Sequence, residues 1–268
     1  MRLEESCVLL TGATGGIGRA VARQLAARGA KLWLSGRREA ELQRLAGDIR
    51  SAGGRAECIV CDLNEPAAAR DMLERIQRSE PRLDMVINCA GSMHFGTFET
   101  TPDTVLENLW RTNVLAPMRL VQAALPKLRR DGGGLIVNVG SIFGSIAFPC
   151  FTMYSTTKFA LRGFSEALRR ELAGSGVDVL YFAPRYTRTP LNSGAVSEMA
   201  EALAMNQDDP EVVAGALLKA IETNRRERYL GWPEKLFVRI NAWFPRLVDA
   251  ALRKQGEQMR PYALRQLP

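Results

Sequence analysis

The chain has 268 residues, of which 46% are hydrophobic, and its 36 basic and 29 acidic residues leave a net charge of +7. Ten basic and five acidic residues fall within 222–268, so this segment carries a net charge of +5. A charge concentrated in one tail excludes a nucleic-acid binder by overall composition. The five cysteines, an odd number placed in apolar runs, indicate free thiols in a reducing compartment, and the single histidine argues against a metal site. We therefore expect a cytoplasmic protein without a metal.

Short apolar runs alternate with longer amphipathic segments along the chain. Several of the runs are hydrophobic at successive positions, as expected for a parallel sheet that is covered on both faces. The alternation predicts an α/β fold of Rossmann type, with a doubly wound, seven-stranded parallel sheet and helices on both faces. The strands are expected at Cys7–Leu10, Lys31–Ser35, Glu57–Cys61, Met85–Asn88, Leu135–Val139, Val177–Phe182 and Arg228–Leu230, and the helices at Gly16–Arg28, Glu39–Ala52, Glu65–Ser79, Pro102–Arg130, Thr152–Ala173 and Glu211–Thr223.

Two segments depart from this alternation. Residues 184–210 form a long connection with weak helical character at 196–205, and connections of that length are usually functional or mobile. Residues 231–268 contain no predicted strand, and their pattern predicts a basic, amphipathic helical extension. We predict one domain over 1–230, with the substrate segment at 184–210, and an extension over 231–268.

The first predicted strand runs into the sequence TGATGGIG, residues 11–18, and then into a helix. Glycines at 12, 16 and 18 let the backbone turn sharply and approach a phosphate closely. The N-terminus of the following helix supplies free N–H groups and a partial positive charge for the anion. Because the turn lies in a strand–helix–strand unit, it predicts dinucleotide binding.

On these residues the sequence resembles the compact single-domain branch of the short-chain dehydrogenase/reductases. Residues 11–18 match the family's Thr-Gly-x-x-x-Gly-x-Gly, and residues 88–91 match its Asn-Asn-Ala-Gly with Cys89 at the second position. The resemblance covers residues 6 to about 230 and implies an oxidoreductase that forms a homodimer or homotetramer through its long helices. The implied cofactor contacts are Gly12, Thr14, Gly15, Gly16, Ile17, Gly18, Asp62, Leu63, Asn88, Ala90, Gly91, Tyr154, Lys158, Pro184, Thr187 and Thr189.

The end of the second strand bears on which nicotinamide cofactor is used. Folds selective for NAD place a carboxylate there, whereas this chain has Arg37 and Arg38. A carboxylate repels a ribose 2′-phosphate, and guanidinium groups match it by bidentate hydrogen bonds. We predict NADP(H); the alternative is that both arginines simply begin a solvated helix.

The sequence MYSTTKFAL, residues 153–161, places Tyr154 and Lys158 on one helix face. A tyrosine with a pKa of about 10 is a poor acid–base group at neutral pH, and a nearby ammonium is expected to lower that value. By resemblance, Ser141 hydrogen-bonds the substrate carbonyl, and Asn113 holds a water that links the lysine to solvent. Asn113, Ser141, Tyr154 and Lys158 are thus the predicted catalytic residues.

After the sixth strand the family commonly has Pro-Gly followed by a threonine that contacts the nicotinamide carboxamide. Here Arg185 stands in place of the glycine after Pro184, and Thr187 or Thr189 is the implied contact. A glycine at this point can adopt backbone dihedral angles that an arginine rarely adopts. Two placements are open: Arg185 points to solvent, or it lies near the pyrophosphate or the substrate.

The substrate pocket is expected between Ser141, Tyr154 and residues 190–210. Its candidate lining is apolar and adaptable, which favours a hydrophobic ketone or secondary alcohol over a sugar or a small acid. The candidates are Phe143, Phe148, Phe151, Leu191, Met199, Leu203 and Met205.

The extension places apolar side chains at helical spacing over 233–255, with basic side chains between them. Pro245 fits the first turn of a second helix or a kink. Such a segment fits an anionic membrane surface, packing on its own subunit, closure of the pocket, or an oligomer interface.

The leading functional hypothesis is an NADP(H)-dependent oxidoreductase that transfers hydride between nicotinamide and a hydrophobic ketone or secondary alcohol, with Tyr154 as acid/base. The alternative is a catalytically silent NADP-sensing or scaffold protein on the same fold. A sugar-nucleotide epimerase would usually have a larger C-terminal substrate domain than this chain provides.

Overall fold

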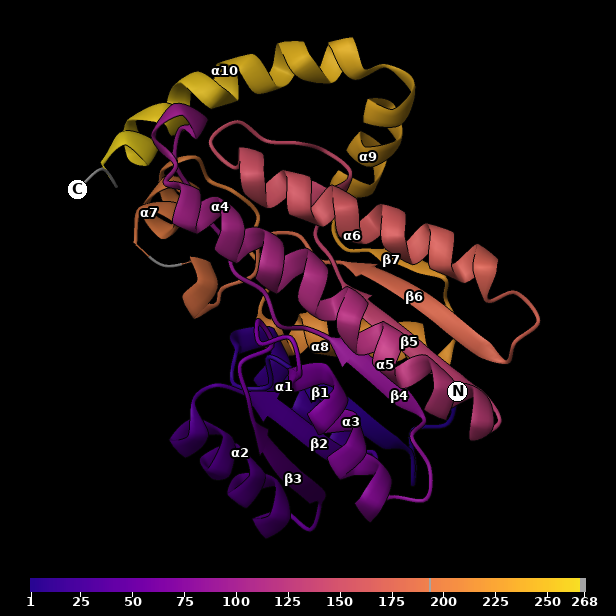
Figure 1. Ribbon diagram of the computed structural model, residues 1–268. Helices are drawn as coiled ribbons and strands as arrows, with labels where there is room; N and C mark the ends of the chain where they lie inside the picture. The colour runs from indigo at the N-terminus through magenta and orange to yellow at the C-terminus, as the bar shows by residue number, and fades with distance from the viewer. Residues whose placement is uncertain (193, 266–268) are drawn as a thin grey trace.

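A computed structural model describes residues 1–192 and 194–265. Its seven strands form one parallel sheet in the order β3-β2-β1-β4-β5-β6-β7, which confirms the predicted Rossmann-type fold (Figure 1). The crossovers change direction between β1 and β4, and open α/β sheets bind ligands at such a switch point. The strands are β1 (Cys7–Thr11), β2 (Lys31–Gly36), β3 (Arg55–Val60), β4 (Met85–Asn88), β5 (Gly134–Val139), β6 (Val177–Ala183) and β7 (Glu227–Tyr229).

Helices cover both faces of the sheet. One apolar cluster joins α1, α2 and α8 to the sheet, and a second joins α3, α5 and α6 to the opposite face. The strands are buried on both faces for this reason, and their apolar runs need no alternation. The helices are α1 (Gly16–Ala26), α2 (Glu39–Ser51), α3 (Ala68–Ser79), α4 (Asp103–Trp110), α5 (Ala116–Arg130), α6 (Thr152–Glu171), α7 (Ala195–Ala202), α8 (Pro210–Glu222), α9 (Glu234–Trp243) and α10 (Pro245–Leu264).

The helix expected over 102–130 is interrupted. Its residues form α4, then a π-helical turn η2 (Arg111–Leu115), and then α5. Single π turns occur mostly inside longer helices and frequently at functional sites. Asn113 lies in this turn and is buried.

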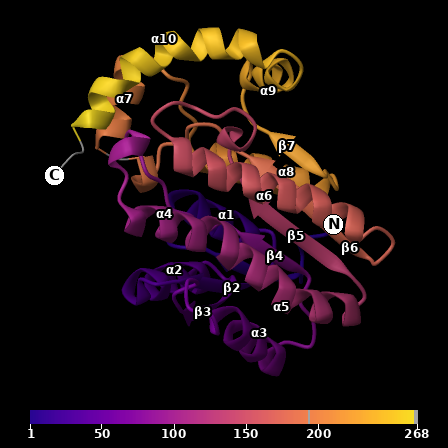
Figure 2. The ribbon, with the colours of Figure 1, turned by 45° about the horizontal axis from the view of Figure 1, so that its top comes forward.

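The extension forms two helices. Pro245 begins α10, so it occupies the first turn of a second helix and makes no internal kink there. Figures 1 and 2 show α10 lying outside α6 and α7, with the α9–α10 corner at the edge of the molecule. Val248 packs on Ile142 and Ile146, and Asn241 donates a hydrogen bond of 2.9 Å to the Ser145 carbonyl. Among the described residues, no helix is long and apolar enough to cross a membrane.

Candidate active site

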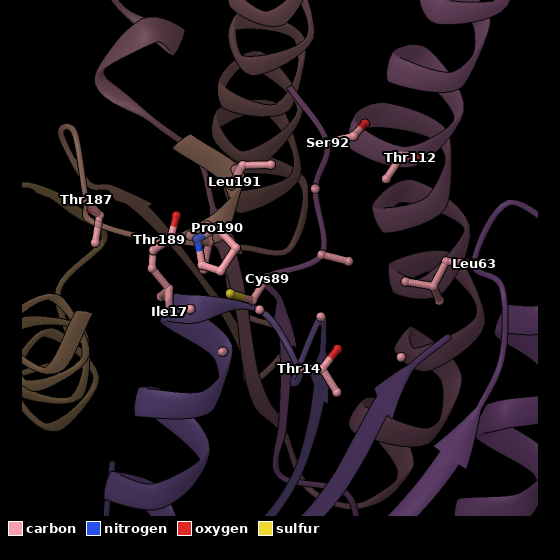
Figure 3. A pocket seen from close by; sticks show the side chains of 18 of the residues that line it. Thr14, Ile17, Leu63, Cys89, Ser92, Thr112, Thr187, Thr189, Pro190 and Leu191 are labelled. Carbon is pink, nitrogen blue, oxygen red and sulfur yellow. The ribbon is translucent and has the colours of Figure 1, made fainter. Parts of the chain in front are cut away.

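A cleft of about 400 Å³ opens at the carboxyl edge of the sheet, where the turns after β1, β2, β4, β5 and β6 meet. In Figure 3, Thr14 and Leu63 lie on one side of it, and Thr189 and Pro190 on the other. Most of the residues predicted for the cofactor, and three of the predicted catalytic residues, line it. They are Gly12, Thr14, Gly15, Gly16, Ile17, Gly18, Arg37, Arg38, Asp62, Leu63, Ala90, Gly91, Ser141, Tyr154, Lys158, Pro184, Thr187 and Thr189, together with Leu191.

Asn88, expected among the cofactor contacts, does not line this cleft. Its amide donates to Asn138 Oδ1 at 2.8 Å, and Asn138 in turn donates to Ser165 Oγ at 2.8 Å. All three side chains are buried. Because a buried polar group must find a partner inside the protein, Asn88 serves here to join β4 to β5 and α6.

The glycine-rich turn approaches its neighbours too closely for side chains. Gly12 has φ +64°, and a Cβ there would lie 2.6 Å from Ala90 Cα. A Cβ on Gly18 would lie 2.2 Å from the Gly12 carbonyl oxygen. The backbone therefore forms a cradle at the N-terminus of α1, and this cradle fits the pyrophosphate of a dinucleotide.

Thr11 fixes the position of this turn, a role that the family motif alone does not explain. Its hydroxyl oxygen accepts hydrogen bonds from the backbone N–H groups of Cys89 at 3.1 Å and Ala90 at 3.2 Å. The hydroxyl also lies 3.3 Å from the Ile87 carbonyl oxygen, to which it donates. One side chain thus joins the ends of β1 and β4.

Tyr154, Lys158 and Ser141 converge at the inner end of the cleft. Lys158 Nζ lies 5.6 Å from the centre of the Tyr154 ring and donates to the Val139 carbonyl at 3.2 Å. Ser141 Oγ accepts a hydrogen bond from Phe143 N at 3.1 Å, which leaves its O–H to donate elsewhere. Tyr181 donates to the Ser141 carbonyl at 3.0 Å and so holds the backbone of this serine. Sequence reasoning missed Tyr181, which is an ordinary apolar position of β6 by pattern.

Burial controls the protonation of this pair. Burial raises the pKa of Tyr154 to about 12, although the Ser141 hydroxyl opposes the shift. Burial also lowers the pKa of Lys158 to about 8, against the opposing influence of Cys89. The lowered phenol pKa expected from the neighbouring lysine is therefore not found: loss of hydration raises the pKa, and the opposing influence comes from the Ser141 hydroxyl. Tyr154 is a neutral phenol at neutral pH and holds a proton that it can donate.

Asn113 reaches this region from the π-helical turn. Its amide donates to the Ser92 carbonyl at 2.8 Å and to Thr157 Oγ1 at 3.0 Å, and its oxygen accepts from Ser92 N at 2.9 Å. A Cβ on Gly91 would lie 3.3 Å from Asn113 Oδ1 and 3.7 Å from Lys158 Nζ. The asparagine and the lysine thus face the same small space. Thr157, a buried partner on α6, was not singled out from the sequence.

The two arginines after β2 have different surroundings. Arg38 donates to the Thr14 carbonyl at 2.9 Å and forms an ion pair of 2.9 Å with Glu41. Glu41, which also pairs with Arg19, is an acid near this end that the sequence analysis overlooked. Arg37 is exposed at the cleft and has no ion-pair partner among residues 1–192 and 194–265. Arg37 is therefore better placed than Arg38 to bind a ribose 2′-phosphate.

Of the two placements left open for Arg185, the one toward solvent is wrong. It lines the cleft, and its side chain is 19% exposed because it pairs with Asp208 and Glu234. Thr187 donates to the Arg185 carbonyl at 3.0 Å. Thr189 packs on the glycine-rich turn, since a Cβ on Gly16 would lie 2.5 Å from its methyl group.

Six of the seven residues predicted for the substrate pocket form one apolar cluster with Tyr154, whereas Leu191 lies outside it and is exposed at the cleft. The rings of Phe143 and Tyr154 are 5.9 Å apart, and those of Phe143 and Phe148 are 4.5 Å apart. Sequence analysis did not include the α10 members of this cluster, since their distance in sequence gives no sign of the contact. The cluster contains Phe95, Phe143, Phe148, Phe151, Tyr154, Val196, Met199, Leu203, Met205, Met259 and Ala263.

The fold and the cleft define a dinucleotide-binding α/β oxidoreductase, and the comparisons with known proteins make this specific. Residues 6–200 match the short chain dehydrogenase family. The oxidoreductase UcpA of Escherichia coli is 33% identical over 227 residues, covering 84% of this chain and 83% of UcpA. The uncharacterized oxidoreductase YxnA of Bacillus subtilis is 30% identical over 259 residues, covering 94% of this chain and 73% of YxnA.

A solved structure of a short chain dehydrogenase/reductase from Burkholderia phymatum, in complex with NAD, superimposes with a TM-score of 0.83. It is 23% identical, and the match covers 92% of this chain and 96% of that one. The protein belongs to the short-chain dehydrogenase/reductase family. It is therefore an oxidoreductase of a family that uses a nicotinamide cofactor.

Gly18→Ala is expected to weaken dinucleotide binding at least tenfold, because the added Cβ meets the Gly12 carbonyl, a backbone atom that cannot move aside freely. Gly163→Ala on α6 is the matched control, since nothing lies within 4 Å of its Cβ. That change should leave affinity intact and stabilise the helix by about 0.5–1 kcal/mol. Fluorescence titration with NADPH and NADH measures the affinity of both variants. Equal affinity of Gly18→Ala and the parent would contradict the role of the glycine-rich turn as a pyrophosphate cradle.

Proposed function

We propose that the protein is an NADP(H)-dependent oxidoreductase that interconverts a hydrophobic ketone and a secondary alcohol. The observation that carries this proposal is the convergence of Tyr154, Lys158 and Ser141 at the inner end of a cleft that begins at a phosphate cradle. The apolar cluster against Tyr154 supports a hydrophobic substrate, because it offers few polar groups to a sugar or an acid.

A nicotinamide cofactor held at the glycine-rich cradle would supply the hydride and, when oxidised, a positive charge. Tyr154 donates its phenolic proton to the substrate oxygen as negative charge develops there. Ser141 donates a hydrogen bond to the same oxygen and orients it. Lys158, charged below a pKa of about 8, stabilises the phenolate that remains. Asn113 keeps the space beside Lys158 in shape through Ser92 and Thr157, and a water held there returns the proton from solvent.

Tyr154→Phe is expected to lower kcat for ketone reduction by about 10²–10⁴-fold, because it removes the proton donor and keeps the ring. The dissociation constant for NADPH should stay within twofold of the parent. Tyr229→Phe is the control, since its hydroxyl contacts Ser145 away from the cleft. Steady-state kinetics with a panel of aromatic and aliphatic ketones gives the comparison. A parent protein that binds NADPH but turns over no member of the panel would favour the silent, NADP-sensing alternative.

Preference for NADP(H) is supported by Arg37, whose exposed guanidinium borders the cleft after β2. A charge-assisted hydrogen bond contributes about 1.5–3 kcal/mol, which corresponds to roughly 10–100-fold in affinity. Arg38 contributes less to this preference, because Glu41 already neutralises part of its charge.

Arg37→Asp is expected to weaken NADPH binding by roughly 10–100-fold and to leave NADH binding unchanged or stronger. Arg44→Asp, an exposed change on α2, the helix that follows Arg37, lies outside the cleft and controls for net charge. Fluorescence titrations with both cofactors at one ionic strength provide the test. A parent that binds NADH as tightly as NADPH would overturn the cofactor assignment.

We further propose a homodimer or homotetramer that functions in the cytoplasm. Family members commonly pair through the long helices that carry Asn113 and Tyr154, and exposed Trp110 and Phe159 lie on α4 and α6. The five cysteines are free, which supports a reducing compartment.

Peripheral contact with an anionic membrane is proposed for the outer side of the extension. Large apolar side chains are exposed there, including Trp243 at 78% and Trp232 at 72%. Basic side chains lie among them, and this combination is typical of segments that bind a bilayer interface. The apolar residues are Trp232, Leu236, Phe237, Trp243, Phe244 and Leu247, and the basic residues are Lys235, Arg239 and Arg246.

Trp243→Ser combined with Phe244→Ser is expected to reduce flotation with phosphatidylglycerol vesicles at least fivefold, because it removes the most exposed aromatic pair of the corner. Val212→Ser combined with Phe98→Ser removes comparably exposed apolar groups elsewhere and should change nothing. Equal flotation of both double variants and the parent would refute membrane contact.

A further inference from the structure

A buried tyrosine of β6 lies behind the backbone of Ser141. Tyr181 is 0% exposed and is the largest fully buried side chain among the described residues. Its hydroxyl donates a hydrogen bond of 3.0 Å to the Ser141 carbonyl and accepts one of 3.4 Å from the Ser141 N–H. Because a hydroxyl is both a donor and an acceptor, this one group bonds both backbone groups of a predicted catalytic residue.

Two glycines make room for this side chain. A Cβ on Gly140 would overlap the Tyr181 ring, and a Cβ on Gly144 would overlap the Tyr181 hydroxyl and lie 2.6 Å from the Lys158 carbonyl oxygen. Neither glycine has a positive φ, so it is the lack of space that excludes a larger residue at both positions. The tyrosine therefore fits closely between the end of β5 and the turn that follows Ser141.

The turn after Ser141 holds its hydroxyl from the other side. Ser141 is extended, with φ −165° and ψ 161°, and its Oγ accepts a hydrogen bond of 3.1 Å from Phe143 N. The Ser141 carbonyl also accepts a hydrogen bond of 3.0 Å from Gly144 N. Because a single torsion angle connects the serine backbone to Oγ, any shift of that backbone moves the hydroxyl within the cleft.

Tyr181 itself does not meet a substrate, because it does not line the cleft. Burial raises the pKa of its phenol well above the ordinary value, so the hydroxyl stays protonated and remains a donor at neutral pH. A phenylalanine would fill the same space but would leave the Ser141 carbonyl with one donor fewer. The hydroxyl is therefore the part of this side chain whose role can be tested separately from packing.

We propose that Tyr181 is a positioning residue for the reaction: its hydroxyl fixes the backbone of Ser141, so that the Ser141 hydroxyl reaches the substrate oxygen beside Tyr154. The inference rests on the proposed ketone reduction, in which Ser141 donates to that oxygen. Tyr181 acts through Ser141 and takes no part in the transfer of the proton. A misplacement of about 1 Å in a reacting site costs about 10²-fold in rate, so even a small movement of Ser141 is measurable.

Tyr181→Phe is expected to lower kcat and kcat/KM equally, by about tenfold, because it loosens a donor that acts in the transition state. KM for the ketone and the dissociation constant for NADPH should stay within twofold of the parent. Steady-state kinetics with the ketone that the parent reduces fastest gives the comparison.

Tyr229→Phe is the matched control. Its ring packs against Tyr181 with the ring centres 6.1 Å apart, and its hydroxyl lies 3.1 Å from the side-chain oxygen of Ser145. Each variant loses a hydroxyl that bonds inside the protein, so each should lower the melting temperature. Only Tyr181→Phe should lower kcat.

A double variant separates positioning from general damage. In Ser141→Ala no hydroxyl remains to be placed, so the further change Tyr181→Phe should lower kcat by no more than twofold. A second tenfold loss in that background, or a kcat of Tyr181→Phe equal to that of the parent, would overturn the proposal.

Hydrogen exchange provides a readout that needs no substrate. The backbone amides of residues 141–144 should exchange at least tenfold faster in Tyr181→Phe, because the Ser141 N–H loses its acceptor and the Ser141 carbonyl loses a donor. They should exchange at the parent rate in Tyr229→Phe. Equal exchange in all three proteins would show that Tyr181 does not fix Ser141. If the parent reduces no ketone but exchange still rises in Tyr181→Phe, the hold on Ser141 stands and the proposed reaction fails.

Discussion

Everything in the cleft depends on how closely the turn after β1 approaches the end of β4. Gly12 leaves no room for a Cβ against the backbone of Ala90, and the Thr11 hydroxyl holds the Cys89 and Ala90 amides at hydrogen-bond distance. Because the crossovers diverge at this point of the sheet, the two strand ends cannot be covered by a helix. In the proposed function, the resulting opening receives the phosphates of the cofactor at one end and the substrate at the other.

Within that opening, burial and charge act against each other. The phenol and the ammonium both lose hydration, which favours the neutral form of each. Tyr154 therefore retains its proton until a partner charge arrives, and Lys158 titrates close to physiological pH. The two pKa values move apart, to about 12 for Tyr154 and about 8 for Lys158, so the phenol does not pass its proton to the lysine and keeps it for a substrate oxygen.

Local patterns in the sequence were enough to predict the seven strands of the parallel sheet, the glycine-rich turn and the convergence of Tyr154 with Lys158, because each rests on residues a few positions apart. The partners of Arg185 lie 23 and 49 residues away, and no periodicity relates such positions. The π-helical turn around Asn113 also escaped prediction, since it inserts a single irregular turn into a long helical pattern. The direction of the Tyr154 pKa shift depends on burial, which spacing alone does not give.

The ion pairs of Arg185 with Asp208 and Glu234 also have a consequence for protein engineering. The glycine that is usual at this position needs no partner, whereas an arginine needs the carboxylates of both the substrate segment and the extension. A chain that lost α9 and α10 would keep a guanidinium at the cleft wall with only one of its two partners. Loss of the tail thus removes one of the two charges that compensate this arginine. We expect a chimera that exchanges C-terminal segments between relatives to gain stability from a matching change at residue 185.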